Sequence, residues 1–119
     1  MKLRIQGNSL RLRLSQKEVA HLRDCRYIES SIEFSPGCRL VYLLEVSFRA
    51  HAITANLDGH TVRVTAPTHA IAQWAESEQV SIEATLPAGL HLLIEKDFQC
   101  LHKPDQQNVD AYPHPLMSS

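Results

Sequence analysis

The four glycines of this 119-residue chain are spaced in a way that limits the possible fold more than any other feature of the sequence. They are Gly7, Gly37, Gly59 and Gly89. The third follows the first by 52 residues, and the fourth follows the second by the same interval. Apolar positions agree at this offset without a gap from residue 2 to residue 43, so that Ile28 corresponds to Val80. Because self-similarity at a fixed period is the signature of repeated units, we predict two tandem repeats, at residues 2–49 and 52–101.

Each predicted repeat begins with a hairpin of two short strands. Residues 2–6 and 10–14 alternate polar and apolar side chains with a period of two, which is typical of a half-buried strand. The pair Gly7-Asn8 between them suits a tight turn, because both residues tolerate positive φ angles. The second repeat has the corresponding strands at residues 53–57 and 62–66 around Asp58-Gly59, a strong hairpin signal.

A short helix and a second hairpin follow in each repeat. Ser15 to Glu18 form a capping box, in which two side chains satisfy free backbone N–H groups at the start of a helix. In the second repeat Pro67 and Thr68 begin the helix, where the missing N–H of proline costs little. The strands of the second hairpins are predicted at residues 27–34 and 38–48, and at residues 80–86 and 90–98. An isolated hairpin buries too little apolar surface to be stable, so we expect the two repeats to pack together.

These patterns predict one β-rich α+β domain that spans residues 1–101. Residues 102–119 are polar, include three prolines and show no periodicity, so we expect an extended or disordered tail. No apolar run approaches the ~18 residues that a membrane span needs, and the first residues lack the apolar core of a signal peptide. The three cysteines have no CxxC spacing, which favours a reducing compartment. We therefore expect a cytoplasmic protein without a membrane partner.

The first hairpin and the capped helix resemble the start of the AbrB/MazE swapped-hairpin family. The resemblance rests on the run from Arg4 to Leu14, with Gly7-Asn8-Ser9 at its turn, and on the helix that follows. The second repeat, over residues 61–98, is similar in plan and has Pro67 at the start of its helix. The resemblance implies a pseudo-dimeric swapped-hairpin barrel made from one chain. It also implies a DNA-binding regulator, because most members of that family are transition regulators or antitoxins.

The whole chain also resembles a family of small uncharacterised bacterial proteins. This second resemblance includes residues 95–98, Cys100-Leu101 and Tyr112-Pro113. It implies no particular function.

Charge is distributed unevenly along the chain. Residues 1–51 contain nine Lys or Arg against five Asp or Glu, whereas residues 52–119 contain three against eight. Two interpretations remain open: the opposite charges attract each other within the fold or between copies, or the first half presents a basic surface to a partner.

Period-two geometry places the cations of the first hairpin on its outward face. The candidate nucleic-acid-binding residues are Lys2, Arg4, Arg11 and Arg13, with Asn8 at the turn and Arg63 on the matching face of the second repeat. Such a face suits the phosphates of duplex DNA, while Asn8 is placed to reach a base edge or a phosphate. The alternative is an ordinary solvated sheet face or a strand edge protected by charge.

Metal and thiol chemistry are weaker candidates. Cys100 and His102 lie two residues apart, with Asp105 and His114 further on, but no second ligand pair has the spacing of a zinc site. Cys38 or Cys100 paired with a histidine imitates a thiol nucleophile and base, yet no catalytic or nucleotide-binding glycine motif accompanies them. We therefore expect no bound metal and no cofactor.

The sequence thus favours a non-enzymatic binding module, with an AbrB-like DNA-binding regulator as the leading hypothesis. The alternative is a protein-interaction module whose basic N-terminal half binds an acidic partner or a second copy. A small enzyme and a metal-binding protein are less favoured. The segment from Tyr112 to Pro115 is a further candidate, as a short docking segment for a protein partner. The oligomeric state is left open.

Overall fold

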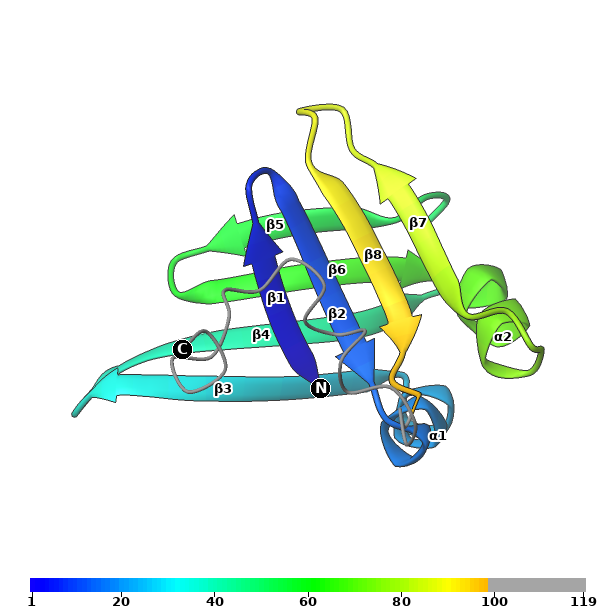
Figure 1. Cartoon of the computed structure of the whole chain (residues 1–119), viewed down its shortest axis with the longest axis horizontal. Helices are drawn as coiled ribbons and strands as arrows, with labels where there is room; N and C mark the ends of the chain where they lie inside the picture. The colour runs from blue at the N-terminus through cyan, green and yellow to red at the C-terminus, as the bar shows by residue number, and fades with distance from the viewer. Residues whose placement is uncertain (99–119) are drawn as a thin grey trace, which may run out of the picture.

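The computed structural model describes residues 1–98, which form two four-stranded sheets and two short helices (Figure 1). The predicted β-rich α+β class is confirmed. The elements of the first half are β1 (Lys2–Gln6), β2 (Ser9–Leu14), α1 (Gln16–Cys25), β3 (Tyr27–Ser35) and β4 (Cys38–Ser47). Those of the second half are β5 (Thr54–Asp58), β6 (Thr61–Pro67), α2 (Thr68–Ala75), β7 (Ser81–Thr85) and β8 (His91–Lys96).

The two halves exchange hairpins. Sheet A has the strand order β1-β2-β8-β7, and sheet B has the order β3-β4-β6-β5. Each sheet therefore combines the first hairpin of one half with the second hairpin of the other half. The hairpins are antiparallel, while the junctions β2–β8 and β4–β6 are parallel. Neither half completes a sheet without the other.

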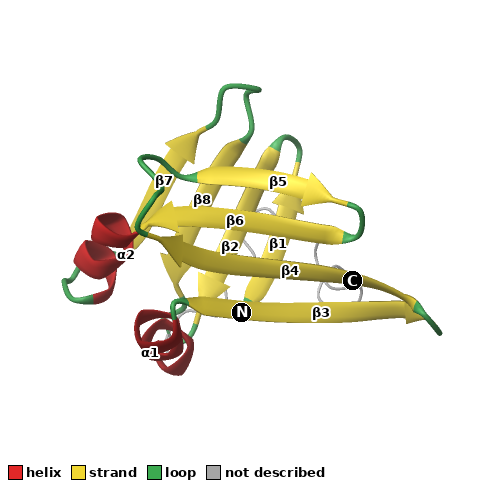
Figure 2. Cartoon of the chain, turned by 180° about the vertical axis from the view of Figure 1, so that it is seen from behind, coloured by secondary structure: helices red, strands yellow, loops and turns green. Residues whose placement is uncertain are grey.

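The barrel that the AbrB/MazE resemblance implies is not confirmed. The eight strands form two open sheets that lie one over the other, with their strands running in crossing directions (Figures 1 and 2). Among residues 1–98, β1 and β7 border sheet A, and β3 and β5 border sheet B. A closed barrel would need hydrogen bonds between these border strands, and the strand pairing does not include them.

The offset of 52 residues holds for the first hairpin and the helix of each half, since β5, β6 and α2 begin 52 residues after β1, β2 and α1. It fails for the second hairpin. The register places Tyr27 opposite Glu45 in sheet B and Ser81 opposite Glu95 in sheet A, so the second hairpin is four residues shorter in the second half. β3 and β7 therefore correspond at an offset of 54, and β4 and β8 at an offset of 50.

The revised offsets explain which side chains occupy equivalent places in the core. Ile28 corresponds to Ile82 rather than to Val80, and both isoleucines are buried, whereas Val80 is 50% exposed. Leu44 and Ile94 correspond in the same way, and both are fully buried. The gapless alignment predicted from the glycines is thus wrong. The glycines mark the hairpin turns, and the shorter hairpin lacks two residues on each side of its turn, so the glycine spacing stays at 52. That the halves arose by duplication stays a prediction.

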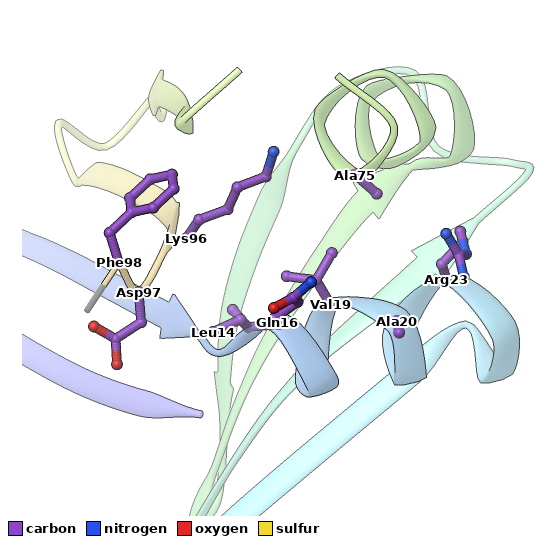
Figure 3. A pocket seen from close by; sticks show the side chains of 9 residues that line it. All are labelled: Leu14, Gln16, Val19, Ala20, Arg23, Ala75, Lys96, Asp97 and Phe98. Carbon is purple, nitrogen blue, oxygen red and sulfur yellow. The ribbon is translucent and has the colours of Figure 1, made fainter. Parts of the chain in front are cut away.

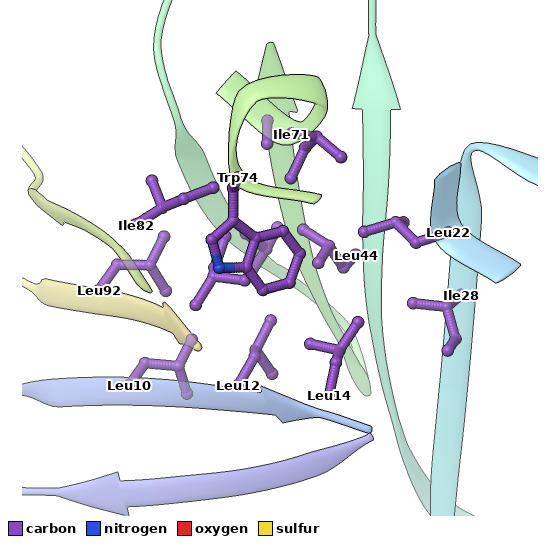
Figure 4. Close-up of a cluster of buried hydrophobic side chains, with 13 residues drawn as sticks. Leu10, Leu12, Leu14, Leu22, Ile28, Leu44, Ile71, Trp74, Ile82 and Leu92 are labelled. Atoms are coloured by element: carbon purple, nitrogen blue, oxygen red, sulfur yellow. The ribbon is translucent and has the colours of Figure 1, made fainter. Parts of the chain in front are cut away.

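The core lies between the sheets and is closed at one end by the two helices (Figure 4). Leu22 of α1 and Trp74 of α2 correspond at the offset of 52 and are both fully buried. The indole Nε1 of Trp74 donates a hydrogen bond of 3.0 Å to the carbonyl oxygen of Val80. Each fully buried leucine or isoleucine contributes roughly 1.5–3 kcal/mol, so the core shared by both halves stabilises their association.

Helix starts agree with the sequence, and strand ends differ by one or two residues. The capping box of Ser15 and Glu18 is formed, and α2 begins directly after Pro67. β8 ends at Lys96 rather than at residue 98, because its partner β2 ends at Leu14, which lies opposite Lys96. None of the described helices has the length and apolar character needed to cross a membrane. The predicted domain limit at residue 101 and the tail at residues 102–119 lie outside the described residues.

We expect Gly59→Val to lower the free energy of unfolding by about 1–2 kcal/mol, because Gly59 adopts a φ of +60° that a β-branched residue resists. No atom lies within 4 Å of a Cβ added there, so backbone strain is the only cause. The matched variant Gly59→Asn should lose less, since asparagine tolerates this conformation. Urea denaturation of both variants tests this, and equal losses would exclude the backbone explanation.

Candidate functional site

The outward face of the β1–β2 hairpin brings together the four cations predicted to share it. Lys2, Arg4, Arg11 and Arg13 line one surface hollow of about 270 Å³, together with Leu3. The strand register places Lys2 directly opposite Arg13, and Arg4 directly opposite Arg11. Like charges in directly opposed positions destabilise a strand pair. Two such pairs side by side therefore require counter-charges, from the chain itself or from a ligand.

Two carboxylates from the other half of the chain provide part of this counter-charge. Glu95 of β8 lies beside Arg13 in the parallel junction. Its Oε1 accepts a hydrogen bond of 3.0 Å from Nε of Arg13 and lies 2.9 Å from Nη2 of the same guanidinium group. The same oxygen lies 3.6 Å from Nε of Arg11. Asp97, just after β8, pairs with Lys2 at 3.0 Å and with Arg13 at 3.9 Å. The basic first half and the acidic second half thus attract each other within the fold.

The compensation is uneven across the hollow. The Lys2–Arg13 pair contacts both carboxylates, whereas the Arg4–Arg11 pair contacts only Glu95, through Arg11. Within the described part of the chain Arg4 has no ion pair, and its side chain is exposed. Four cations and two carboxylates leave a formal excess of two positive charges, which is concentrated at Arg4 and Arg11. Paired guanidinium groups in this arrangement suit phosphate or carboxylate oxygens.

The amino group of Met1 lies next to this cluster and is held by the carboxylate of Glu18. Burial is the main cause that lowers the pKa of this amino group below its ordinary value. The Lys2 ammonium adds to the lowering, and the carboxylate of Asp97 opposes it.

The structure does not bring Arg63 to the other predicted residues. Arg63 lies on the outer face of sheet B, where its Nη1 contacts Glu45 at 3.2 Å, and the hydroxyl of Thr65 donates to the same carboxylate at 3.0 Å. The face of the second repeat that matches the first hairpin therefore belongs to the other sheet, because β1 and β2 lie in sheet A and β6 lies in sheet B. That Arg63 contributes to nucleic-acid binding stays a prediction. Asn8 lies at the β1–β2 turn, where its carbonyl oxygen accepts a 3.0 Å hydrogen bond from the His91 backbone N–H.

Sequence reasoning missed Glu95 and Asp97 as members of the cluster. The signals available were the acidic excess of the second half and the alternation of residues along β8. Neither signal shows which strand lies beside β2, because residues 82 apart in the chain meet at that junction.

The other candidates carry less structural support. Cys100, His102, Asp105, His114 and the Tyr112–Pro115 segment all lie outside the described residues. Within residues 1–98 no three His, Cys, Asp or Glu side chains gather as metal ligands do. Cys38 is exposed at the start of β4. The other cysteine in this region, Cys25, is also exposed, and its Sγ lies 3.8 Å from Nδ1 of His21 on α1.

A larger hollow of about 740 Å³ lies between α1, the end of α2 and the end of β8 (Figure 3). Two charged residues that line it, Lys96 and Asp97, already contact other groups of the protein. Nζ of Lys96 donates to the Ser77 carbonyl oxygen at 2.8 Å and lies 5.9 Å from the centre of the Trp74 ring. Asp97 pairs with Lys2. The remaining lining is mostly apolar or small, so this hollow offers less charge to a ligand than the β1–β2 face.

Comparison with known proteins identifies one family. Residues 1–116 match the model of a family described as a family of unknown function, DUF7009. No curated protein and no solved structure matches the chain. None of these comparisons supports the resemblance of the two halves to AbrB and MazE.

We expect Arg4→Asn to raise the free energy of unfolding by about 0.2–1 kcal/mol at low salt, because it removes the like-charge pair with Arg11. Asparagine is the residue at the corresponding place in sheet B, where Asn56 lies opposite Arg63. The gain should shrink at high salt, which screens exposed charges. Urea denaturation in low and high NaCl measures both effects.

The reverse substitution, Asn56→Arg, is the matched control for this argument. It creates an opposed pair with Arg63 and should lower the free energy of unfolding by a similar amount at low salt. If Arg4→Asn destabilises the protein at every salt concentration, repulsion between Arg4 and Arg11 is not a significant term.

Proposed function

We propose that this chain, which belongs to the DUF7009 family, is a non-enzymatic module that binds duplex DNA through the outer face of its β1–β2 hairpin. The observation that carries the proposal is the opposed pair of Arg4 and Arg11, which share a hollow with two further cations but receive only one carboxylate between them. An anion bound there removes a repulsion that exists in the free protein. The binding free energy therefore includes the relief of that repulsion.

A phosphate backbone fits this site better than a single small anion. The guanidinium groups extend from neighbouring strands and line the hollow on the outward face of the hairpin. Lys2 and Arg13 continue the positive face along the same two strands. A polyanion contacts the whole row at once and releases the counterions condensed on it, which drives binding of basic surfaces to DNA. Asn8, at the tip of the same hairpin, offers an amide group to a base edge.

The strand topology adds support of a different kind. Each half gives its first hairpin to one sheet and its second hairpin to the other. Hairpin exchange between two similar units is the arrangement that the resemblance to the AbrB/MazE family implies, and members of that family are mostly DNA-binding regulators. As part of this proposal, the protein acts as an AbrB-like regulator in the cytoplasm.

A protein-interaction module is the rival function. An acidic protein surface would use the same excess charge, and salt weakens both kinds of complex. A competition experiment distinguishes the two functions. Duplex DNA displaces an acidic protein from the hairpin if the hairpin binds DNA, and leaves the complex intact if the hairpin binds only protein.

We expect the chain to bind labelled random-sequence duplex DNA with a slope of about −2 in a plot of log K against log salt, because the site has an excess of about two charges. Affinity should fall roughly tenfold between 50 and 200 mM salt. The double variant Arg4→Asn/Arg11→Gln should lose the binding, because it removes the less compensated pair. Fluorescence anisotropy at several salt concentrations measures these effects.

The matched control is Arg63→Gln, which removes the residue equivalent to Arg11 from the opposite sheet. Its affinity should equal that of the unchanged protein. Absence of binding at 50 mM salt would exclude DNA as the ligand. Equal losses in the double variant and in Arg63→Gln would show that binding depends on total charge and not on this face.

A further inference from the structure

The two parallel junctions place an arginine and a glutamate at equivalent positions, but the two pairs differ in how closely they contact. In sheet B, Nη1 of Arg63 donates a hydrogen bond of 3.2 Å to Oε2 of Glu45. In sheet A, Nε of Arg11 lies 3.6 Å from Oε1 of Glu95, which is beyond hydrogen-bond range. Arg11 therefore lacks the hydrogen bond to a glutamate that its counterpart makes.

The residue directly opposite each glutamate explains this difference. In sheet B that residue is Thr65, whose hydroxyl donates to Oε1 of Glu45 at 3.0 Å and leaves Oε2 to the arginine. In sheet A it is Arg13, whose Nε and Nη2 lie 3.0 and 2.9 Å from Oε1 of Glu95. A guanidinium group offers several N–H groups and a full charge, so it holds a carboxylate more strongly than a hydroxyl does. Glu95 therefore contacts Arg13 more closely than Arg11.

Further contacts hold Arg13 in this place. Its Nη1 lies 3.9 Å from Oδ1 of Asp97, so carboxylates lie near both ends of its guanidinium group. The side chain of Glu95 is only 14% exposed, which limits the screening of its attraction to Arg13 by salt. Within residues 1–98 the opposed pair of Arg4 and Arg11 has the 3.6 Å contact as its only counter-charge. The two carboxylates thus compensate Arg13 first, and the opposed pair keeps most of its positive charge.

We propose that Arg13 is a positioning residue that holds Glu95 away from Arg11. Arg11 and its opposed neighbour Arg4 are thereby kept free to bind phosphate groups. This inference rests on the proposed function, since it concerns the same face, and it gives Arg13 a role beyond the charge that it adds there. Without Arg13, we expect Glu95 to reach back two residues to Arg11, as the glutamate of sheet B reaches its arginine. A phosphate would then have to displace the carboxylate before it contacts both arginines.

A double-mutant cycle tests this role, with inorganic tripolyphosphate as the probe and isothermal titration calorimetry at low salt as the measurement. Arg13→Thr copies the residue of sheet B and should weaken binding roughly tenfold, because it removes one charge and releases Glu95 to Arg11. Glu95→Gln removes the competing carboxylate. In that background Arg13→Thr should weaken binding only about threefold, through the lost charge alone.

Lys2→Thr is the matched control, because it also removes one cation from the face and copies Thr54, the equivalent residue of sheet B. Lys2 pairs with Asp97, so its substitution should cost the same affinity with and without Glu95→Gln. Glu95→Gln alone should tighten binding about twofold, because Arg11 loses its remaining counter-charge. This single variant keeps the test decisive if Arg13→Thr does not fold.

Equal losses from Arg13→Thr in both backgrounds would overturn the proposal, since Arg13 would then act through its charge alone. Weaker binding after Glu95→Gln, or no binding of tripolyphosphate to the unchanged chain, would also overturn it. Failure of the proposed function gives a different result. In that case the cycle gives the expected values for tripolyphosphate, while the unchanged chain does not bind duplex DNA at low salt.

Discussion

The parallel junctions between β2 and β8 and between β4 and β6 are the interactions on which the rest of the structure depends. Each junction joins a first hairpin to a second hairpin from the other half, so each sheet requires both halves. Because the core lies between these two sheets, Leu22 and Trp74 are buried among residues of both of them. The junction between β2 and β8 also places an acidic strand beside the basic hairpin, which determines how much positive charge remains available to a ligand.

The same side-chain pattern occurs at both junctions. Arg11 lies opposite Leu93, with Glu95 two residues further on, and Arg63 lies opposite Leu43, with Glu45 two residues further on. One difference between the sheets is the border strand, which carries Arg4 in sheet A and asparagine at the equivalent position in sheet B. At the β4–β6 junction of sheet B, Glu45 balances Arg63. On the β1–β2 face of sheet A, four cations face two carboxylates, Glu95 and Asp97. This excess of positive charge makes the β1–β2 face, and not the face around Arg63, the candidate binding face.

Local features were predictable from the sequence, whereas neighbours across the junctions were not. The turns, the Ser15 capping box and the shared face of the four cations follow from patterns over a few residues, because short-range geometry decides them. The contact between Arg13 and Glu95 joins residues 82 apart, and no local pattern encodes it. The shorter length of the β7–β8 hairpin was not predictable from the sequence for another reason. When both strands lose the same number of residues, the spacing between the glycines does not change. Only the equivalent core positions of Ile28 and Ile82, which are 54 residues apart, reveal the difference in length.

The asymmetry between the halves has a consequence for binding strength. A formal excess of two charges on one face supports few phosphate contacts, and so moderate affinity at physiological salt. Sheet B does not provide a second face, because Glu45 compensates Arg63.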